Sequence, residues 1–225
     1  LSKSKKLDWL LEKGTIANAF PVENEKTNYC NEFQLKGDLV EITNEFNKEG
    51  KLSPFLNSGL MIKGQIHTTK TKPIYKGAKT VLEMVLQNGE VSDEFFIDQM
   101  DLPKWQYLKG SKKEVRKTKD GFEYNYSEGG MIFPDALDNA SRTIITGEGG
   151  KSASRFKHVV NSERGLRRLT PIELERLNMF PDNHTRLDGV TDTKRAFFMG
   201  NALVVGVIEK IGEELSKQIK KKLIP

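Results

Sequence analysis

Cysteine is the scarcest chemically useful residue of this chain. Among its 225 residues Cys30 is the single cysteine, which excludes a disulfide within the chain and favours a reducing compartment. Neither a second cysteine nor a histidine lies close to Cys30 in the sequence. We therefore expect Cys30 to be a small buried or half-buried side chain and not a reactive thiol.

Long hydrophobic runs are absent as well. No run approaches the roughly 20 apolar residues that a membrane-spanning helix requires, and residues 1–7 lack the apolar core of a secretory signal. The content of 30% charged and 36% hydrophobic residues is ordinary for a globular protein of one or two domains. These features predict a cytoplasmic protein.

Metal and nucleotide motifs are not present in recognisable form. The three histidines, His67, His158 and His184, are scattered along the chain and do not follow the spacing of zinc ligands. The glycine-rich turn at 147–150 lacks the lysine–threonine ending of a loop that binds nucleoside triphosphates. We expect no metal site.

What the chain does have is positive charge gathered in two stretches. The net charge is +5, and lysines surround two aromatic residues at 104–117, while a second basic stretch runs from 151 to 168. Lysine and arginine neutralise phosphates, and aromatic side chains can fill a groove. The candidate duplex-DNA-binding residues are the cations and aromatics of these stretches: Lys104, Trp105, Tyr107, Lys109, Lys112, Lys113, Arg155, Lys157, His158, Arg167 and Arg168. The alternative is that these charges only solvate the surface and that Trp105 and Tyr107 belong to the core.

The first two-thirds of the chain have irregular, strand-like patterning. An amphipathic helix is expected at 4–13, ending at Gly14. Beyond it, alternating apolar residues broken by glycine, asparagine and proline predict short strands. The expected strands are 38–42, 94–97 and a pair within 59–66 that turns at Lys63-Gly64. A helix is expected at 79–86, where apolar residues have helical spacing.

Two later helices have clearer signals. Thr170, Pro171 and Glu173 form a capping box with proline at the first helical position. The second helix is expected to start near Asn201, because apolar residues then recur at helical spacing. They share one face: Val204, Ile208, Ile211 and Leu215. Lysines from 217 to 222 suit the negative end of this helix.

The order of several blocks in the last third of the chain is specific. Residues 141–146 precede the glycine-rich turn, and His158 is followed by the Arg-Arg-Leu-Thr-Pro-Ile-Glu block at 167–173, Phe-Pro-Asp at 180–182 and Gly-Asn at 200–201. This ordered string resembles the C-terminal third of the DNA (cytosine-5) methyltransferases. The blocks cover about 140–215, and the stretch before them lies where that family carries its variable target-recognition domain.

The resemblance implies an α+β fold in three parts. A lead-in at 1–14 would precede an irregular, strand-rich target-recognition domain at 15–185. The segment 186–225 would then return as a C-terminal helix to an α/β catalytic domain outside this chain. In such enzymes, found in restriction–modification systems of bacteria and phages, the methyl group comes from S-adenosylmethionine.

The resemblance also assigns roles to residues of the two blocks. The first block and its helix would support the recognition domain through six residues: Arg168, Thr170, Glu173, Arg176, Phe180 and Pro181. In the second block, Asn201 and Ala202 would lie beside the cofactor, and Ala202 stands where many relatives have serine.

The chemistry of the family is not present in this chain. The family's nucleophilic cysteine lies between proline and glutamine, whereas Cys30 lies between Tyr29 and Asn31. The partner glutamate block and the glycine-rich cofactor motif are not matched either. We therefore expect no catalytic residue in the chain and no activity alone. A catalytic domain or subunit would supply the cysteine and most of the S-adenosylmethionine site, and the chain would be a truncated piece or one subunit of a split enzyme.

Two other functions remain open at this point. A magnesium-dependent nuclease would use Asp182, Asp192 and Lys194, because that chemistry needs two carboxylates and a lysine around a metal. A non-catalytic DNA-binding or assembly module would instead use the apolar C-terminal helix as a docking face. An incompletely covered face of this kind also predicts a homodimer.

Overall fold

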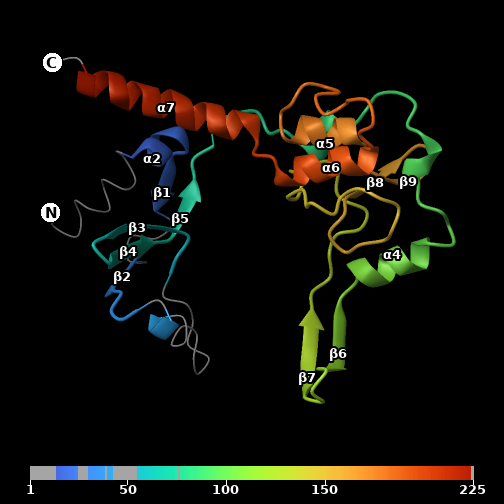
Figure 1. Cartoon of the computed structure of the whole chain (residues 1–225), viewed down its shortest axis with the longest axis horizontal. Helices are drawn as coiled ribbons and strands as arrows, with labels where there is room; N and C mark the ends of the chain where they lie inside the picture. Colours follow the sequence, from blue (N-terminus) through green and yellow to red (C-terminus); the bar gives the residue numbers. More distant parts are fainter. Residues whose placement is uncertain (1–13, 25–29, 39, 43–54, 76, 224–225) are drawn as a thin grey trace. The chain divides into compact units, whose positions relative to one another are not determined.

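The computed structural model, shown in Figure 1, describes residues 14–24, 30–38, 40–42, 55–75 and 77–223. The helix expected at 4–13 lies outside these residues. Contacts within the chain divide it into two units, residues 1–77 with 209–225 and residues 78–208. We call them the terminal unit and the central unit. This division does not fall at the expected boundary near 185, and the functional extent of the domains stays a prediction.

The terminal unit is built from short antiparallel strands and a long helix. Its elements are α2 (Thr15–Ala19), β1 (Val22–Asn24), β2 (Cys30–Gln34), β3 (Ser58–Ile62), β4 (Gln65–Thr69), β5 (Thr71–Pro73) and most of α7 (Val205–Leu223). Strand β4 lies between β2 and β3, and β1 pairs with β5. The predicted hairpin is confirmed, since Lys63 and Gly64 connect β3 to β4 with φ angles of 50° and 78°. Positive φ at both positions is the geometry of a tight hairpin turn.

Two predictions in this unit are wrong. Residues 40–42 are helical rather than extended, because the Asp38 carboxylate accepts the amides of Val40 and Glu41 at 2.8 and 2.9 Å. That is how a short polar side chain starts a helical turn. Cys30 is exposed on β2 and not buried.

The central unit combines two hairpins with short helices. Its elements are the 3₁₀ helices η2 (Leu82–Val85) and η3 (Asp93–Phe95), α4 (Leu102–Lys109), β6 (Lys112–Lys117), β7 (Glu123–Glu128), β8 (Val159–Ser162), β9 (Gly165–Arg168), α5 (Pro171–Leu177) and α6 (Asp192–Asn201). Strand β6 pairs with β7 and β8 with β9. The core cluster lies under α5 and α6 and comprises Leu82, Val160, Leu169, Leu174, Ala196 and Met199. Helices and small antiparallel sheets together make the chain α+β, as expected.

Tertiary hydrogen bonds shorten the elements expected at 79–86 and 94–97. The amides of Leu82 and Glu83 donate to the carbonyls of Asn139 and Leu137 at 2.9 and 3.0 Å, so only one 3₁₀ turn forms there. Residues 93–95 are also 3₁₀, and Phe96 makes a single bridge to Arg167 of β9. The predictions of a full helix and a strand at these places are therefore wrong.

The second late helix also begins later than expected. Asn201 ends α6, residues 202–204 are not helical, and α7 starts at Val205. The break is held by the Val205 amide, which donates to the Asn178 carbonyl at 3.0 Å. Ile208 and Leu215 on α7 are 45% and 48% exposed, and the dimer expected through this face stays a prediction. None of the described helices is long and apolar enough to cross a membrane.

Candidate nucleic-acid interface

The Arg-Arg-Leu-Thr-Pro-Ile-Glu block forms a buried network of hydrogen bonds at the start of α5. The Thr170 hydroxyl accepts the Glu173 amide at 3.3 Å, and the Glu173 carboxylate accepts the Thr170 amide at 2.9 Å, which is the predicted capping box. Arg167 donates both ends of its guanidinium to the same carboxylate at 2.7 and 2.8 Å. The backbone amide of Gln87 also donates to the Glu173 carboxylate, at 2.9 Å. A carboxylate buried in this way requires all these donors.

A second buried ion pair joins α5 to α6. Arg195 of α6 donates to the Glu175 carboxylate at 3.0 Å, and the Thr185 amide donates to the same oxygen at 2.9 Å. Burial raises the pKa of Glu175, but hydrogen bonds from Thr185 and Arg195 outweigh burial and hold the pKa below its usual value. The helix that follows the first block is thereby fixed to the helix that ends in the second.

The two blocks also meet directly through the backbone. The Asn178 side-chain amide donates to the Met199 backbone carbonyl at 2.8 Å. The backbone carbonyl of Asn178 accepts the Val205 amide. A Cβ atom at Gly200 would lie 2.4–2.5 Å from backbone atoms of Ile145 and Thr146, so the Gly-Asn block needs glycine for this close approach. The segments that were separate in the sequence are one structural assembly.

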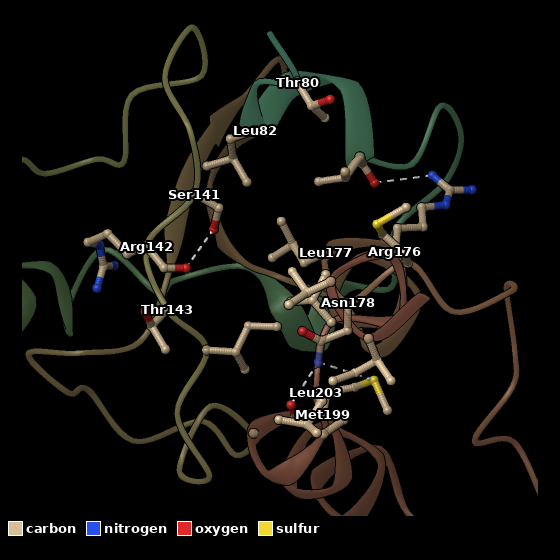
Figure 2. A pocket seen from close by; sticks show the side chains of 18 of the residues that line it. Thr80, Leu82, Ser141, Arg142, Thr143, Arg176, Leu177, Asn178, Met199 and Leu203 are labelled. Carbon is tan, nitrogen blue, oxygen red and sulfur yellow. Dashed lines mark hydrogen bonds between the residues drawn. The ribbon is translucent and has the colours of Figure 1, made fainter. Parts of the chain in front are cut away.

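A hollow of about 690 Å³ lies over this junction, between η2, the segment 141–144, α5 and the break after α6. In Figure 2 the side chains of Leu82, Leu177 and Met199 face the hollow, while the guanidinium groups of Arg142 and Arg176 point away from it. Ala202 lines the hollow, but Asn201 does not, and the Asn201 amide donates to the Phe197 carbonyl of its own helix at 2.9 Å.

S-adenosylmethionine does not fit the side chains that this hollow offers. The cofactor carries a positively charged sulfonium, an ammonium group and ribose hydroxyls, which need carboxylates or other acceptors. The lining residues in the described part of the chain are mainly apolar and include no aspartate or glutamate. The roles predicted for Asn201 and Ala202 stay predictions, and the hollow suits apolar side chains better than a charged ligand.

Most cations of the second basic stretch are directed into the protein. Lys157 donates to the carbonyls of Gly150 and Ser152 at 2.9 and 2.8 Å. Arg155 donates to the carbonyls of Leu108 and Gly110 at 3.0 and 3.2 Å. Arg168 donates to the Gly150 carbonyl at 2.9 Å. These side chains satisfy backbone carbonyls of loops and of the C-terminal end of α4.

Lys109 of α4 has the same inward direction. Its ammonium group is buried, donates to the Lys157 carbonyl and lies near the Trp105 ring, which is itself only 1% exposed. Burial, with repulsion from Arg142, lowers the pKa of Lys109 to about 8. Burial likewise lowers the pKa of Lys157. The prediction that Trp105 and Lys109 meet DNA conflicts with this burial, because neither side chain reaches the surface.

His158 and its neighbours form a further buried network. The His158 ring lies 2.9 Å from Glu148 through Nδ1 and 3.2 Å from the Arg142 carbonyl through Nε2. Arg142 donates to both oxygens of Asp135 at 2.7 and 3.0 Å. Burial opposes the ionisation of Asp135, but the hydrogen bonds from Arg142 and the Val159 amide outweigh it and lower the pKa of Asp135. His158 thus acts as a packing residue in this structure.

Only three of the eleven candidate DNA-binding residues are exposed: Lys104, Tyr107 and Lys113. Lys112 is half-buried and pairs with Glu128 at 3.0 Å. Contact with DNA is untested for all eleven, and burial is the physical reason to look elsewhere on the unit. The charge of Arg167 is used by the Glu173 carboxylate at the start of α5, and that of Arg168 by the backbone carbonyls of Gly150 and Glu94.

The structure presents another set of polar residues on the β6–β7 ribbon, which extends away from α5 and α6 in the central unit (Figure 1). It includes Lys117, Asn125 and Ser127, which the sequence prediction did not select, beside Lys113, which it did. The period-two alternation of Tyr124 and Tyr126 with polar residues at 123–128 was the signal that could have identified a two-sided strand.

The alternative nuclease residues do not converge. The Asp182 carboxylate is taken by Arg176, which donates to both oxygens at 2.7 and 2.8 Å. Asp192 accepts from Arg195 at 3.3 Å, and the Lys194 ammonium lies over the rings of Phe197 and Phe198. No group of three or more potential metal ligands is found among the described residues.

Comparison with known proteins defines the class. A family model described as C-5 cytosine-specific DNA methylase matches residues 5–217, which is nearly the whole chain. The chain therefore belongs to the C-5 cytosine-specific DNA methylase family, in agreement with the resemblance of its ordered blocks.

Individual relatives place the chain more closely. It is 46% identical over 163 residues to the type II methyltransferase M.Sau3AI of Staphylococcus aureus, and the match covers 72% of this chain but 38% of that protein. Two solved structures also match: Dnmt2 methyltransferase of S. pombe (TM-score 0.44, 14% identity, 69% of this chain and 51% of that one) and EhMeth of Entamoeba histolytica (0.43, 12%, 85% and 55%). The chain thus spans well under half the length of its bacterial relative.

Proposed function

We propose that this chain is the DNA-recognition portion of a cytosine-5 DNA methyltransferase, which methylates C5 of a cytosine within a specific duplex sequence using S-adenosylmethionine. Family membership supports the reaction class, and the type II name of the bacterial relative is consistent with a restriction–modification setting. The observation that carries the recognition role is the interlocked α5–α6 junction in the same unit as an outward-facing basic ribbon.

The chain is inactive alone in this proposal. Methylation at C5 requires a cysteine thiolate that adds to C6, an acid that assists at the ring and a positioned methyl donor. Cys30 does not stand in the family's proline–cysteine–glutamine setting, so the nucleophile comes from a catalytic portion outside this chain.

The 690 Å³ hollow is the proposed contact surface for that catalytic portion. Its lining is largely apolar, and Leu203 and Met179 at its edge are 68% and 58% exposed. An apolar hollow loses its exposure to water when apolar side chains fill it, which stabilises the association. The Arg-Arg-Leu-Thr-Pro-Ile-Glu block and the Gly-Asn block would then serve to build one rigid docking face.

A chimera tests this function. The region of M.Sau3AI that matches this chain over 163 residues is replaced by the corresponding residues of this chain, and transfer of labelled methyl groups to duplex DNA is measured. We expect the chimera to methylate DNA and the isolated chain to bind duplex DNA, with an affinity that falls steeply with salt, without methyl transfer.

The controls separate the parts of the proposal. Labelled methyl transfer by the isolated chain would show that it carries its own catalytic centre. A chain that is folded but binds no duplex DNA at low salt would contradict the recognition role. A folded chimera that binds DNA but transfers no methyl group would contradict the docking of the two portions.

A further inference from the structure

The β6–β7 ribbon has two chemically different faces. Alternate residues of a strand point to opposite sides, and directly paired residues share a side. One face, which we call the inner face, carries the pairs Lys112–Glu128, Glu114–Tyr126 and Arg116–Tyr124. The opposite side is the outer face, formed by Lys113, Val115, Lys117, Glu123, Asn125 and Ser127.

The inner face is satisfied by contacts within the central unit. Glu128 accepts from Lys112 at 3.0 Å and from Arg155 at 2.9 Å. The Arg116 guanidinium lies 3.4 Å from the centroid of the Tyr126 ring and donates to Glu114 at 2.7 Å. These contacts hold the base of the ribbon and leave its inner side chains engaged with one another.

The outer face has almost no such contacts. All six of its side chains are exposed, and Val115 is 65% exposed. Lys117 and Glu123 lie 3.5 Å apart, but both are 63% exposed, so the pair contributes little to stability. In the part of the chain that the structure describes, the side chains of Lys113, Asn125 and Ser127 have no hydrogen-bond or ion-pair partner. The polar groups of this face are free to bind something else.

A shallow hollow of about 330 Å³ marks the middle of this ribbon. Val115 and Asn125, which are directly opposite each other, line it together with Lys113 and Ser127 of the outer face and with Glu114 and Tyr126 of the inner face. Directly paired residues place their Cβ atoms about 4.5–5.5 Å apart. An apolar group and a side-chain amide are therefore presented side by side on this face.

The dimensions of the ribbon suit the major groove of B-form DNA. Six residues in each strand extend about 20 Å, and the major groove, about 12 Å wide, admits a two-stranded antiparallel ribbon. In that groove adenine presents an acceptor and a donor that match an asparagine amide, and thymine presents a methyl group that matches an apolar side chain.

Given the proposed role in DNA recognition, on which this step rests, we propose that the outer face enters the major groove and that Asn125 and Val115 together read one A·T base pair. Asn125 bonds to N6 and N7 of adenine, and Val115 packs on the methyl group of the paired thymine. Lys113 and Lys117, two residues to either side of Val115, reach phosphates or guanine acceptors.

The test begins with the sequence preference of the full chain. Duplexes with a randomised 12-base-pair centre are selected for binding, and the preference at each position is compared between the wild-type chain and the N125A, V115A and K220A variants. We expect the wild type to prefer A·T at one position by about 5- to 150-fold. N125A should lose that preference, V115A should weaken it, and K220A, an exposed change on α7, should retain it.

Base analogues then identify the atoms. In the selected duplex, 7-deazaadenine removes the N7 acceptor and deoxyuridine removes the thymine methyl. The first change should weaken wild-type binding severalfold but leave N125A binding unchanged. The second change should weaken wild-type binding severalfold but leave V115A binding unchanged. Coupling of this kind requires contact and does not arise from a variant that has simply unfolded.

The outcomes distinguish two failures. If the folded wild-type chain binds no duplex, the proposed function itself fails and this assignment fails with it. If the chain selects a sequence but N125A and V115A select the same one with the same strength, recognition stands and the ribbon assignment is overturned. Unchanged binding of all variants to both analogues would overturn it equally.

Discussion

The two basic regions of the central unit use positive charge in opposite ways. Between residues 142 and 168, most arginine and lysine side chains turn inward and donate to carboxylates and backbone carbonyls, as Arg167 does to Glu173 and Lys157 does to Gly150. Between 113 and 127, the outer face of the ribbon leaves its polar groups in solvent. The difference teaches that clustered charge in a sequence does not indicate whether the charge supports a fold or meets a ligand.

The largest expected effect comes from removing an inward cation. R167M leaves the Glu173 carboxylate buried without its forked partner, which costs about 3–5 kcal/mol of the free energy of unfolding. Urea unfolding followed by circular dichroism measures the loss. The matched control, K113M on the outer face of the ribbon, should change stability by less than about 0.5 kcal/mol. Equal losses in the two variants would remove the distinction between the regions.

Close backbone packing at the junction predicts the next effect. G200A should lower stability by about 1–3 kcal/mol, because the new methyl group would overlap backbone atoms of Ile145 and Thr146 that cannot move aside cheaply. G212A on α7 is the control, since nothing lies within 4 Å of its Cβ position. This change should be neutral or stabilising by up to about 1 kcal/mol, because alanine favours the helix. Thermal unfolding of both variants compares the sites.

The cap of α5 gives a somewhat smaller effect. T170A removes the hydroxyl that accepts the Glu173 amide, and loss of a threonine cap typically costs about 0.5–2 kcal/mol. T170S retains the acceptor and should recover most of the stability. Both variants are measured by chemical denaturation, and an unchanged midpoint for T170A would contradict the role of this cap.

The last effect concerns pH and Lys109. Its folded pKa is about 8, whereas an unfolded lysine titrates near 10.4, so between these values the unfolded chain binds more protons. The free energy of unfolding should therefore rise from pH 8 to pH 10, by less than about 1.4 kcal/mol per pH unit for this group. Below pH 8 Lys109 is protonated in both states and should contribute no further pH dependence. K109M should reduce the rise seen in urea titrations at pH 7.5, 8.5 and 9.5. An identical dependence of stability on pH in both proteins would show that the pKa of Lys109 is not lowered in the folded state.

The sequence predicted features whose causes are local and missed those whose causes are tertiary. The Thr170 cap and the Lys63-Gly64 turn are confirmed because neighbouring residues determine them. The helix expected at 79–86 is reduced to one 3₁₀ turn by hydrogen bonds to residues 137 and 139. The break between α6 and α7 likewise depends on Asn178, which is distant in the sequence from Val205.

The candidate site shows the same limit. The family and the proximity of its two blocks could be predicted from their order in the chain. The direction of a lysine or arginine side chain could not, because the carbonyl partners of Lys109 and Arg155 lie on segments that are distant from them in the sequence. Of the ribbon, the sequence indicates only Lys112 and Lys113. Asn125 and Ser127 carry no charge, and only the strand register shows that they share a face with Lys113.

The salt dependence of DNA binding tests the distinction between the regions most directly. Three exposed ribbon lysines, Lys113, Lys117 and Lys119, are replaced by alanine in one variant, and three exposed α7 lysines, Lys210, Lys220 and Lys221, in another. The slope of log K against log salt should shrink by about 2–3 in the ribbon variant, at about 0.9 per lost phosphate contact, and stay unchanged in the α7 variant. An unchanged slope in the ribbon variant, or an equal loss in both, would contradict the account.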